Sequence, residues 1–256
     1  MKIFTASILF AALLSLTAFS QKPSSATPAE TSASPAAIKL PEAKEIIERY
    51  VRALGGRDAL SKHKSRYEKG TIELSPMGIK GTVETFSRSD DRALTKLSID
   101  GIGDIFEGFD GKTAWSVNPV QGNRVKSGTE LAQAKRNSTF RRELNLDKMY
   151  DGLKVRGIEK VGERDTYVVV ASSAGLPDDI LYFDTETGLL MRSDSIVVTP
   201  EGNQAMSSFY DDYREVEGIK SAFKVRAKTP AFEINTAVSE VKYGVAIDDS
   251  KFVQPK

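Results

Sequence analysis

From Ser65 onward, apolar and polar residues alternate in short segments separated by turn signals, and this pattern constrains the fold more than any other feature. The first two segments, 71–74 and 79–84, flank the turn sequence Ser-Pro-Met-Gly at 75–78. Alternation with a period of two indicates strands with one buried face, and connections this short join antiparallel neighbours. The sequence therefore predicts a long antiparallel meander.

Two helical segments interrupt the strand pattern. Pro41 suits the first turn of a helix, apolar residues then recur at helical spacing, and Gly55-Gly56 ends the segment. We predict helices over 41–54 and over 128–149, the second with a break near Asn137-Ser138, and a short helical turn over 57–62. The remaining predicted strands are 94–99, 103–109, 112–117, 154–161, 165–172, 180–183, 189–198, 206–213, 223–229 and 232–242.

A meander this long must protect its two edge strands, and closing or half-closing into a barrel is one way to do so. If the sheet curls without closing, the two helical segments are the natural cover for its open mouth. We therefore predict an α+β fold class: a curved antiparallel sheet that forms an unclosed β-barrel with a helical lid. A barrel of about this strand number can hold one small apolar ligand. An exposed first or last strand could also pair with a strand of a partner.

The N-terminal residues carry the signals of export. Met1-Lys2 precedes a mostly apolar run to Phe19, and Ala18-Phe19-Ser20 forms a small-x-small cleavage site. We predict a signal peptide at 1–20, a flexible Ser/Ala/Pro-rich spacer at 21–39 and one folded domain at 40–256. No later apolar run reaches spanning length, so we predict a periplasmic protein with no transmembrane segment in the mature chain.

Composition excludes several classes of function. The chain has no cysteine, which excludes disulfides, thiol nucleophiles and the lipid-modified cysteine of a bacterial lipoprotein. Its formal net charge is +1, and basic and acidic residues are interspersed. Because no basic stripe is present, we expect no nucleic-acid partner.

Residue types for catalysis are sparse. The single histidine, His63, lies between lysines at a helix exit, so we expect a surface side chain rather than a member of a catalytic triad. The carboxylate pairs Asp178-Asp179, Asp211-Asp212 and Asp248-Asp249 lie at strand ends or in polar loops, where solvated turn residues are the expected role. An acid–base pair, or a metal site that adds Glu215 to Asp211-Asp212, is the weaker alternative. We predict no enzyme activity, no cofactor and no metal.

Aromatic residues gather on or beside the predicted strands. For any one of them, core packing is the expected role. As a set on one curved sheet, those that face inward would line an apolar interior, and the sequence leaves both a filled and an open interior as alternatives. We predict ligand contacts from Phe106, Phe109, Trp115, Val117, Tyr182 and Phe183.

Four segments resemble one known family. DGKTAWSVNP at 110–119 resembles the D-G-K-x-x-W-x-x-x-P strand of the LolA/LolB-like carriers, the outer-membrane lipoprotein-sorting proteins of bacterial envelopes. The tail IDDSKFVQP at 247–255 is similar to the D-x-x-x-F-x-x-P ending of that family. YFDTETGLL at 182–190 and YREVEGIK at 213–220 look like hairpins of its poorly characterised branches. The order of the elements agrees over about 40–255.

The resemblance implies an unclosed antiparallel barrel with a helical lid over an apolar cavity. The best-known members hold the acyl chains of lipoproteins while they carry them across the periplasm. The tryptophan region would then lie beside the cavity. The classical carrier couples lid opening to release through an arginine; Arg88 and Arg92 lie in the corresponding part of the chain, although nothing around either fixes an alignment. The residues that match the tryptophan strand are Asp110, Gly111, Lys112, Trp115 and Pro119.

Three functions fit these observations to different degrees. The first is a periplasmic binding or carrier protein for a lipid or an acylated, lipoprotein-like ligand held in an apolar barrel cavity. The alternative is an envelope sensor or protein-interaction domain on the same fold, with a filled core and an envelope protein as partner. A carboxylate-dependent hydrolase is the third. A cavity of about 300 Å³ or more would favour the first.

Overall fold

A computed structural model describes residues 39–255 of the chain. The predicted signal peptide at 1–20 lies outside the described residues, as do the predicted spacer up to residue 38 and Lys256. Within the described part, no helix is long and apolar enough to cross a membrane.

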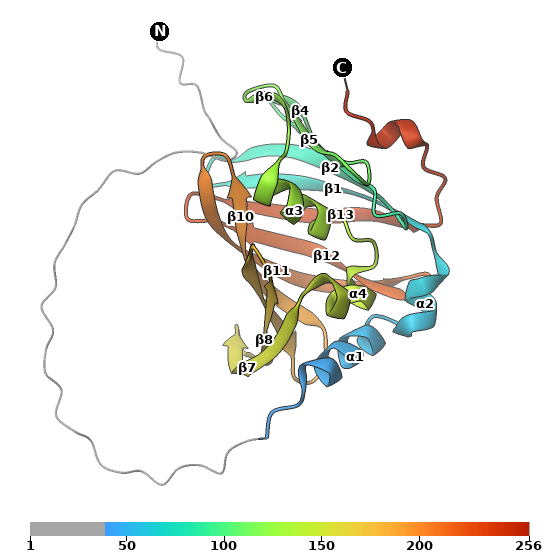
Figure 1. Ribbon diagram of the computed structural model, residues 1–256, viewed down its shortest axis with the longest axis vertical. Helices are drawn as coiled ribbons and strands as arrows, with labels where there is room; N and C mark the ends of the chain where they lie inside the picture. The colour runs from blue at the N-terminus through green and yellow to red at the C-terminus, as the bar shows by residue number, and fades with distance from the viewer. Residues whose placement is uncertain (1–38, 256) are drawn as a thin grey trace, which may run out of the picture.

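One antiparallel sheet of 13 strands forms the body of the described residues 39–255 (Figure 1). The strands lie in the order β6-β5-β4-β3-β2-β1-β13-β12-β11-β10-β9-β8-β7, so the barrel is not closed between β6 and β7. The predicted fold class is therefore confirmed. The strands are β1 (Ser65–Ser75), β2 (Ile79–Arg88), β3 (Ala93–Ile99), β4 (Gly103–Phe109), β5 (Ala114–Asn118), β6 (Gly122–Val125), β7 (Gly152–Val161), β8 (Arg164–Ser173), β9 (Leu176–Asp184), β10 (Leu190–Thr199), β11 (Gly202–Val216), β12 (Ile219–Lys228) and β13 (Glu233–Tyr243).

The first and last strands lie in the middle of the sheet. β1 pairs with β13 from Arg66↔Tyr243 to Ser75↔Glu233, with one irregularity at Lys69/Gly70. The expectation of an exposed first or last strand is therefore wrong, because each of the two covers the other's edge. The outermost strands are instead β6 and β7, which precede and follow the helical segment in the middle of the chain.

Helices cover one face of this sheet, which we call the concave face; the opposite side is the outer face. α1 (Ala43–Ala53) and α2 (Gly56–Lys62) lie at one end, and α3 (Gly128–Asn137) and α4 (Arg142–Met149) lie across the curve of the sheet (Figure 1). The predicted break near Asn137-Ser138 is confirmed, since α3 ends at Asn137. A short 3₁₀ helix, η1 (Asp249–Phe252), follows the last strand.

The main core joins α1 and α4 to the sheet. Ile46, Ile47 and Val51 of α1 are buried together with Leu146 of α4 and with side chains of β8, β9 and β12. The ring of Tyr50 lies 5.2 Å from that of Phe183, centre to centre. This apolar packing, rather than helix propensity, holds α1 against the sheet.

The backbone packs closely where α2 begins, at Gly55. Gly55 has φ of 124°, and a Cβ atom placed on it would lie 2.0 Å from the carbonyl oxygen of Gly218. The amide of Lys220 donates to the carbonyl of Leu54 at 2.8 Å, so the end of α1 is joined to the β11–β12 turn. Only glycine fits at residue 55, because the position needs both the positive φ and the space.

Candidate functional site

The tryptophan of the sequence motif lies on the outer face, 1% exposed. Trp115 is paired across the strands with Gly108, and a Cβ on Gly108 would lie 2.2 Å from the indole. Because Gly108 has no side chain, the indole of Trp115 can pack directly against the backbone of β4. Asp110 accepts hydrogen bonds from the amides of Lys112 and Thr113 at 2.8 and 2.7 Å, which makes the start of the motif a turn.

The C-terminal segment covers this tryptophan. Phe252 is completely buried and packs in one cluster with Trp115 and Leu94, and its carbonyl accepts a hydrogen bond from the indole Nε1 at 3.2 Å. Two sequence motifs that lie far apart in the chain thus form one contact. Together the two motifs cover the outer face of β3 to β5 and exclude water from it.

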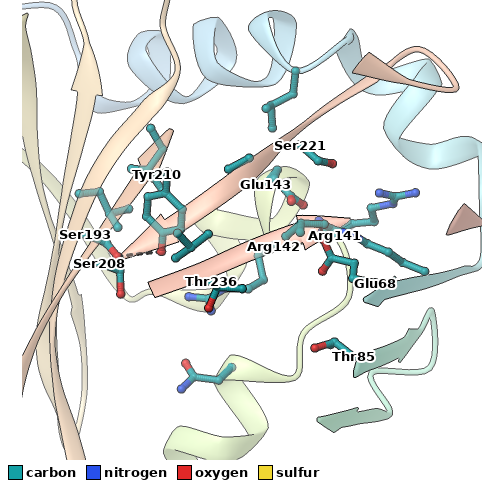
Figure 2. A pocket seen from close by; sticks show the side chains of 18 of the residues that line it. Glu68, Thr85, Arg141, Arg142, Glu143, Ser193, Ser208, Tyr210, Ser221 and Thr236 are labelled. Carbon is teal, nitrogen blue, oxygen red and sulfur yellow. Dashed lines mark hydrogen bonds and ion pairs between the residues drawn. The ribbon is translucent and has the colours of Figure 1, made fainter. Parts of the chain in front are cut away.

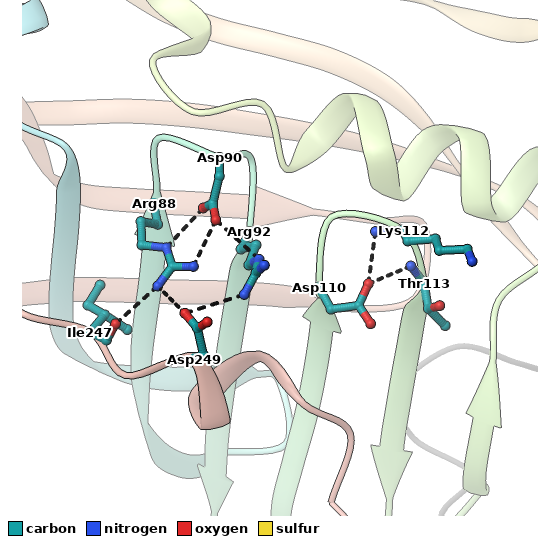
Figure 3. Close-up of polar contacts among 8 residues, drawn as sticks. All are labelled: Arg88, Asp90, Arg92, Asp110, Lys112, Thr113, Ile247 and Asp249. Atoms are coloured by element: carbon teal, nitrogen blue, oxygen red, sulfur yellow. Dashed lines mark hydrogen bonds and ion pairs between the residues drawn. The ribbon is translucent and has the colours of Figure 1, made fainter.

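The two candidate arginines of the sequence analysis also hold the C-terminal segment (Figure 3). Arg88 lies 2.5 Å from Asp249 and 2.7 Å from Asp90, and it donates to the carbonyl of Ile247 at 3.2 Å. Arg92 lies 3.1 Å from Asp90 and 3.4 Å from Asp249. These ion pairs therefore connect the C-terminal segment to the β2–β3 turn.

A cavity with two lobes lies on the concave face, beneath α3 and α4. Each lobe has a volume of about 540 Å³. The lobes share part of their lining, including Arg66, Glu68, Arg141 and Glu143, so they meet at the linker between α3 and α4. We call this shared region the junction.

Both lobes combine apolar and polar side chains. Leu97, Ile105 and Phe109 line the lobe beside β3 and β4, and Leu54 and Phe183 line the lobe beside α1. Hydroxyl groups and charged groups lie among them, as Figure 2 shows for the side of β10 to β13 and the start of α4. The lining is thus more polar than the apolar cavity that the sequence predicts. Polar lining residues labelled in Figure 2 include Thr85, Ser193, Ser208, Tyr210, Ser221 and Thr236.

Helix α3 is held in place by polar contacts. The Gln133 side chain donates to the carbonyl of Ile196 at 2.7 Å and accepts from the amide of Val198 at 2.9 Å, as a neighbouring strand would. The Arg136 guanidinium lies 3.0 Å from the carboxylate of Asp179. The buried residues of α3 are Gln133 and Arg136, both polar.

Helix α4, in contrast, belongs to the main core through Leu146 and through Tyr150, the residue that follows the helix. The Tyr150 hydroxyl donates to Asp179 at 2.5 Å. Burial, together with this carboxylate, raises the pKa of Tyr150 to about 12. Polar groups can return to water with little loss, whereas apolar core groups cannot. The contacts of α3 therefore cost less to break than those of α4.

Electrostatics at the junction are dominated by arginines. Burial lowers the pKa of Arg141, whose guanidinium lies 4.9 Å from the ring centre of Phe140 and 5.0 Å from that of Tyr243. Burial would also lower the pKa of Arg66, but Glu68 and other neighbours outweigh it and hold this pKa above its usual value. Because arginine is not deprotonated in proteins, both side chains carry their charge inside the cavity.

The structure divides the six predicted ligand contacts between the two faces. Phe109 and Phe183 line the cavity, one in each lobe. Trp115, Phe106 and Val117 lie in the cluster on the outer face. The sixth residue, Tyr182, is opposite Arg192 on the outer side of β9 and donates a hydrogen bond to Asp194 at 2.9 Å. The expected position of the tryptophan beside the cavity is wrong, because the Trp115 side chain packs in the outer cluster and lines neither lobe.

Two expectations about polar residues have different outcomes. His63 is not a surface side chain: it is 11% exposed, and its ring stacks on Tyr243 with centres 5.4 Å apart. Asp212 lies within β11, where it is paired with Arg214 at 2.7 Å, and Asp248 caps η1 through the amide of Ser250. Asp248 therefore has the turn role that the sequence predicts. The pairs Asp211-Asp212 and Asp178-Asp179 instead lie inside β11 and β9, because both strands extend further than predicted. The expectation of a solvated turn residue is wrong for Asp179, which is 5% exposed and paired with Arg136.

Comparison with known proteins supports the fold. No protein-family model matches the chain, and no curated protein matches it. A LolA superfamily protein from Nitrosomonas europaea shares 13% identity with a TM-score of 0.56, over 84% of this chain and 99% of that protein. A DUF1329 family protein from Desulfovibrio piger shares 17% identity with a TM-score of 0.54, over 82% and 97% of the two chains. The predicted LolA-like resemblance is confirmed as a likeness of fold.

The residues of the junction were not predicted from the sequence. Arg66 and Glu68 lie on an ordinary alternating strand, and Arg141 to Glu143 follow the predicted helix break at Asn137-Ser138. No local signal distinguishes these charges from those of a solvated surface. They become a site only because the sheet curls and the helical segment crosses it.

Proposed function

We propose that this protein is a periplasmic binding or carrier protein that holds a lipid or an acylated ligand in the cavity beneath α3. The observation that carries the proposal is the cavity itself, with two joined lobes of about 540 Å³ each. Ligand pockets of proteins have volumes of about 300 to 1,000 Å³. The LolA-like fold supports the same conclusion.

The lining suits an acyl chain with a polar end. A buried methylene contributes about 0.8 kcal/mol to lipid binding, and apolar side chains such as Leu97, Phe109 and Phe183 are available for it. Of the predicted ligand contacts, Phe109 and Phe183 are the two that can contact a ligand in the cavity. Trp115, Phe106, Val117 and Tyr182 then stabilise the outer face of the wall.

A carrier must open, and we infer that α3 is the part that moves. Its polar anchors are the amide of Gln133, the ion pair of Arg136 with Asp179 and the ion pair of Glu130 with Arg124 of β6, and water can replace each of them. The proposed export of domain 40–256 through signal peptide 1–20 and spacer 21–39 would place this cavity in the periplasm. Such a role requires binding and release and no catalytic group.

Native mass spectrometry of the protein purified without detergent tests the proposal. We expect a population with added mass that organic extraction removes and that a lipid extract restores. A protein that carries no added mass, and that takes up none from the extract, would contradict a carrier function. The alternative, a sensor or interaction domain, calls for a filled interior, and the volume of the two lobes supports the carrier instead.

A further inference from the structure

Two arginines at the junction keep buried N–H groups without partners. The guanidinium carbons of Arg66 and Arg141 lie 5.9 and 5.0 Å from the ring centre of Tyr243. The Nε atom of Arg66 and the Nε and Nη2 atoms of Arg141 are buried and have no hydrogen-bond partner among residues 39–255. Arg141 is only 9% exposed. Unpaired buried donors of charged groups are costly, which indicates a partner that a ligand supplies.

The neighbouring carboxylates leave these donors free. Glu68 accepts from Nη2 of Arg66 at 2.6 Å and does not reach its Nε atom. Glu143 lines the same region from α4. Three arginines and two glutamates line both lobes, so the junction has one positive charge in excess. They are Arg66, Arg141, Arg142, Glu68 and Glu143.

The backbone fixes the position of Arg141. Its φ of 55° lies in the left-handed region, which residues other than glycine adopt only at a cost. The carbonyl of Arg141 accepts hydrogen bonds from the amide of Leu144 and the side chain of Asn145, each at 2.9 Å. These bonds hold the linker in the conformation that keeps the guanidinium over the ring of Tyr243.

We propose that the junction binds the anionic group, a carboxylate or a phosphate, of an amphiphilic ligand whose acyl chain occupies a lobe. A guanidinium binds either anion through two parallel hydrogen bonds, and a partly buried site strengthens them. Phe109 in one lobe and Phe183 in the other provide apolar surface on both sides of the junction. This inference rests on the proposed carrier function and narrows its ligand class.

Three ligands with one acyl chain and different head groups test the inference: palmitic acid, palmitoyl lysophosphatidic acid and monopalmitoylglycerol. Their affinities for the delipidated protein are measured by isothermal titration calorimetry. We expect at least one acid to bind about tenfold or more tightly than the neutral glyceride, as two or more charge-assisted hydrogen bonds require. The preference between the two acids distinguishes a carboxylate ligand from a phosphate ligand.

Variants assign the preference to the arginines. R66M and R141M should each weaken binding of the preferred acid about tenfold and leave the affinity for monopalmitoylglycerol nearly unchanged. E143Q should strengthen binding of the acid, because it removes a competing carboxylate. R156M is the matched control, since Arg156 is exposed, pairs with Glu159 and lies outside the cavity lining.

The outcomes separate this inference from the carrier function. Equal affinity for all three ligands, or a preference for acids that survives both arginine variants, would overturn the anionic site and leave the carrier function standing. Failure to bind any of the three would contradict the carrier function itself. If R141M does not fold, R141K replaces it: a lysine keeps the charge but loses the paired donors, so unchanged affinities in both R141K and E143Q would also overturn the site.

Discussion

At the scale of single residues, the protein uses its largest side chains to attach the C-terminal segment. Trp115 lies against Gly108 on one side and contacts Phe252 on the other. The indole also donates its only hydrogen bond to the carbonyl of Phe252. Because Trp115 is the only tryptophan of the chain, its fluorescence reports on this contact and not on the cavity.

Replacing Phe252 with alanine should release the C-terminal segment. The substitution removes a fully buried ring, so we expect a loss of about 3 to 5 kcal/mol of stability and a red shift of the Trp115 emission. Chemical denaturation followed by fluorescence measures both. V253A is the control, because Val253 is the next residue and is 63% exposed. Equal effects of the two substitutions would contradict the packing described for the outer face.

A second residue, Asp184, makes the stability of the folded protein depend on pH. Burial alone would raise its pKa, but hydrogen bonds from Thr187 and Glu186 and the charge of Arg164 outweigh burial and hold the pKa below its usual value. A carboxylate whose pKa is lower in the folded state stabilises the protein above its unfolded pKa of about 3.9. This contribution is lost as the pH falls through the folded pKa.

The D184N variant should therefore lose about 2 kcal/mol of stability at pH 7. The difference from the wild type should shrink as the pH falls below about 4, where the wild-type carboxylate takes up its proton. Thermal unfolding across this range measures the effect. D178N, an exposed position on the same strand, should unfold like the wild type at every pH. A D184N deficit that did not change with pH would argue against this role of the charge.

At the scale of elements, α3 differs from the other helices in how it is attached. The pairing of β10 with β9 ends at Asp194↔Ile180. Beyond that point, the side chain of Gln133 forms hydrogen bonds with the backbone of β10 in place of β9. A helix fastened in this way can leave the sheet without exposing a buried apolar face.

Replacing Gln133 with alanine should make α3 open more often. Two hydrogen bonds of about 1 kcal/mol each are lost, so amide hydrogen exchange of α3 should accelerate by one to two orders of magnitude while that of α4 stays unchanged. K135A, on the exposed side of the same helix, is the control. Equal acceleration in α3 and α4 would mean that the two helices move as one unit, contrary to the contacts described here.

The sequence predicts the order of the helices and strands, but it does not predict the first and last residue of every element. The hairpin around residues 75–78 and the break at Asn137-Ser138 agree with the structure, because turn chemistry and periodicity are local signals. Strand β6 was missed, since its four residues, Gly-Asn-Arg-Val, include one apolar side chain and are too few to show alternation. The strand β9 was predicted too short, because its first residues, Leu176 to Asp179, include a proline and two aspartates.

In the molecule as a whole, the pairing of β1 with β13 brings together segments from the two ends of the described chain. This pairing joins residues near 70 to residues near 238, a distance in sequence that no local pattern specifies. The same pairing brings the C-terminal segment onto Trp115 and Tyr243 beside Arg66. The outer cluster and the junction could therefore be described only once the sheet order was known.

A blocked cavity provides the most direct test of ligand binding beneath α3. Ala134 lines the lobe beside β3 and β4, whereas Ala132 on the same helix is exposed. Titration of a fluorescent fatty-acyl probe into the wild type, A134W and A132W compares the two positions with the same substitution. We expect the wild type and A132W to bind with equal affinity and A134W to bind at least tenfold more weakly, as the filled lobe excludes several methylenes. Equal binding by all three proteins would contradict a ligand site in this cavity.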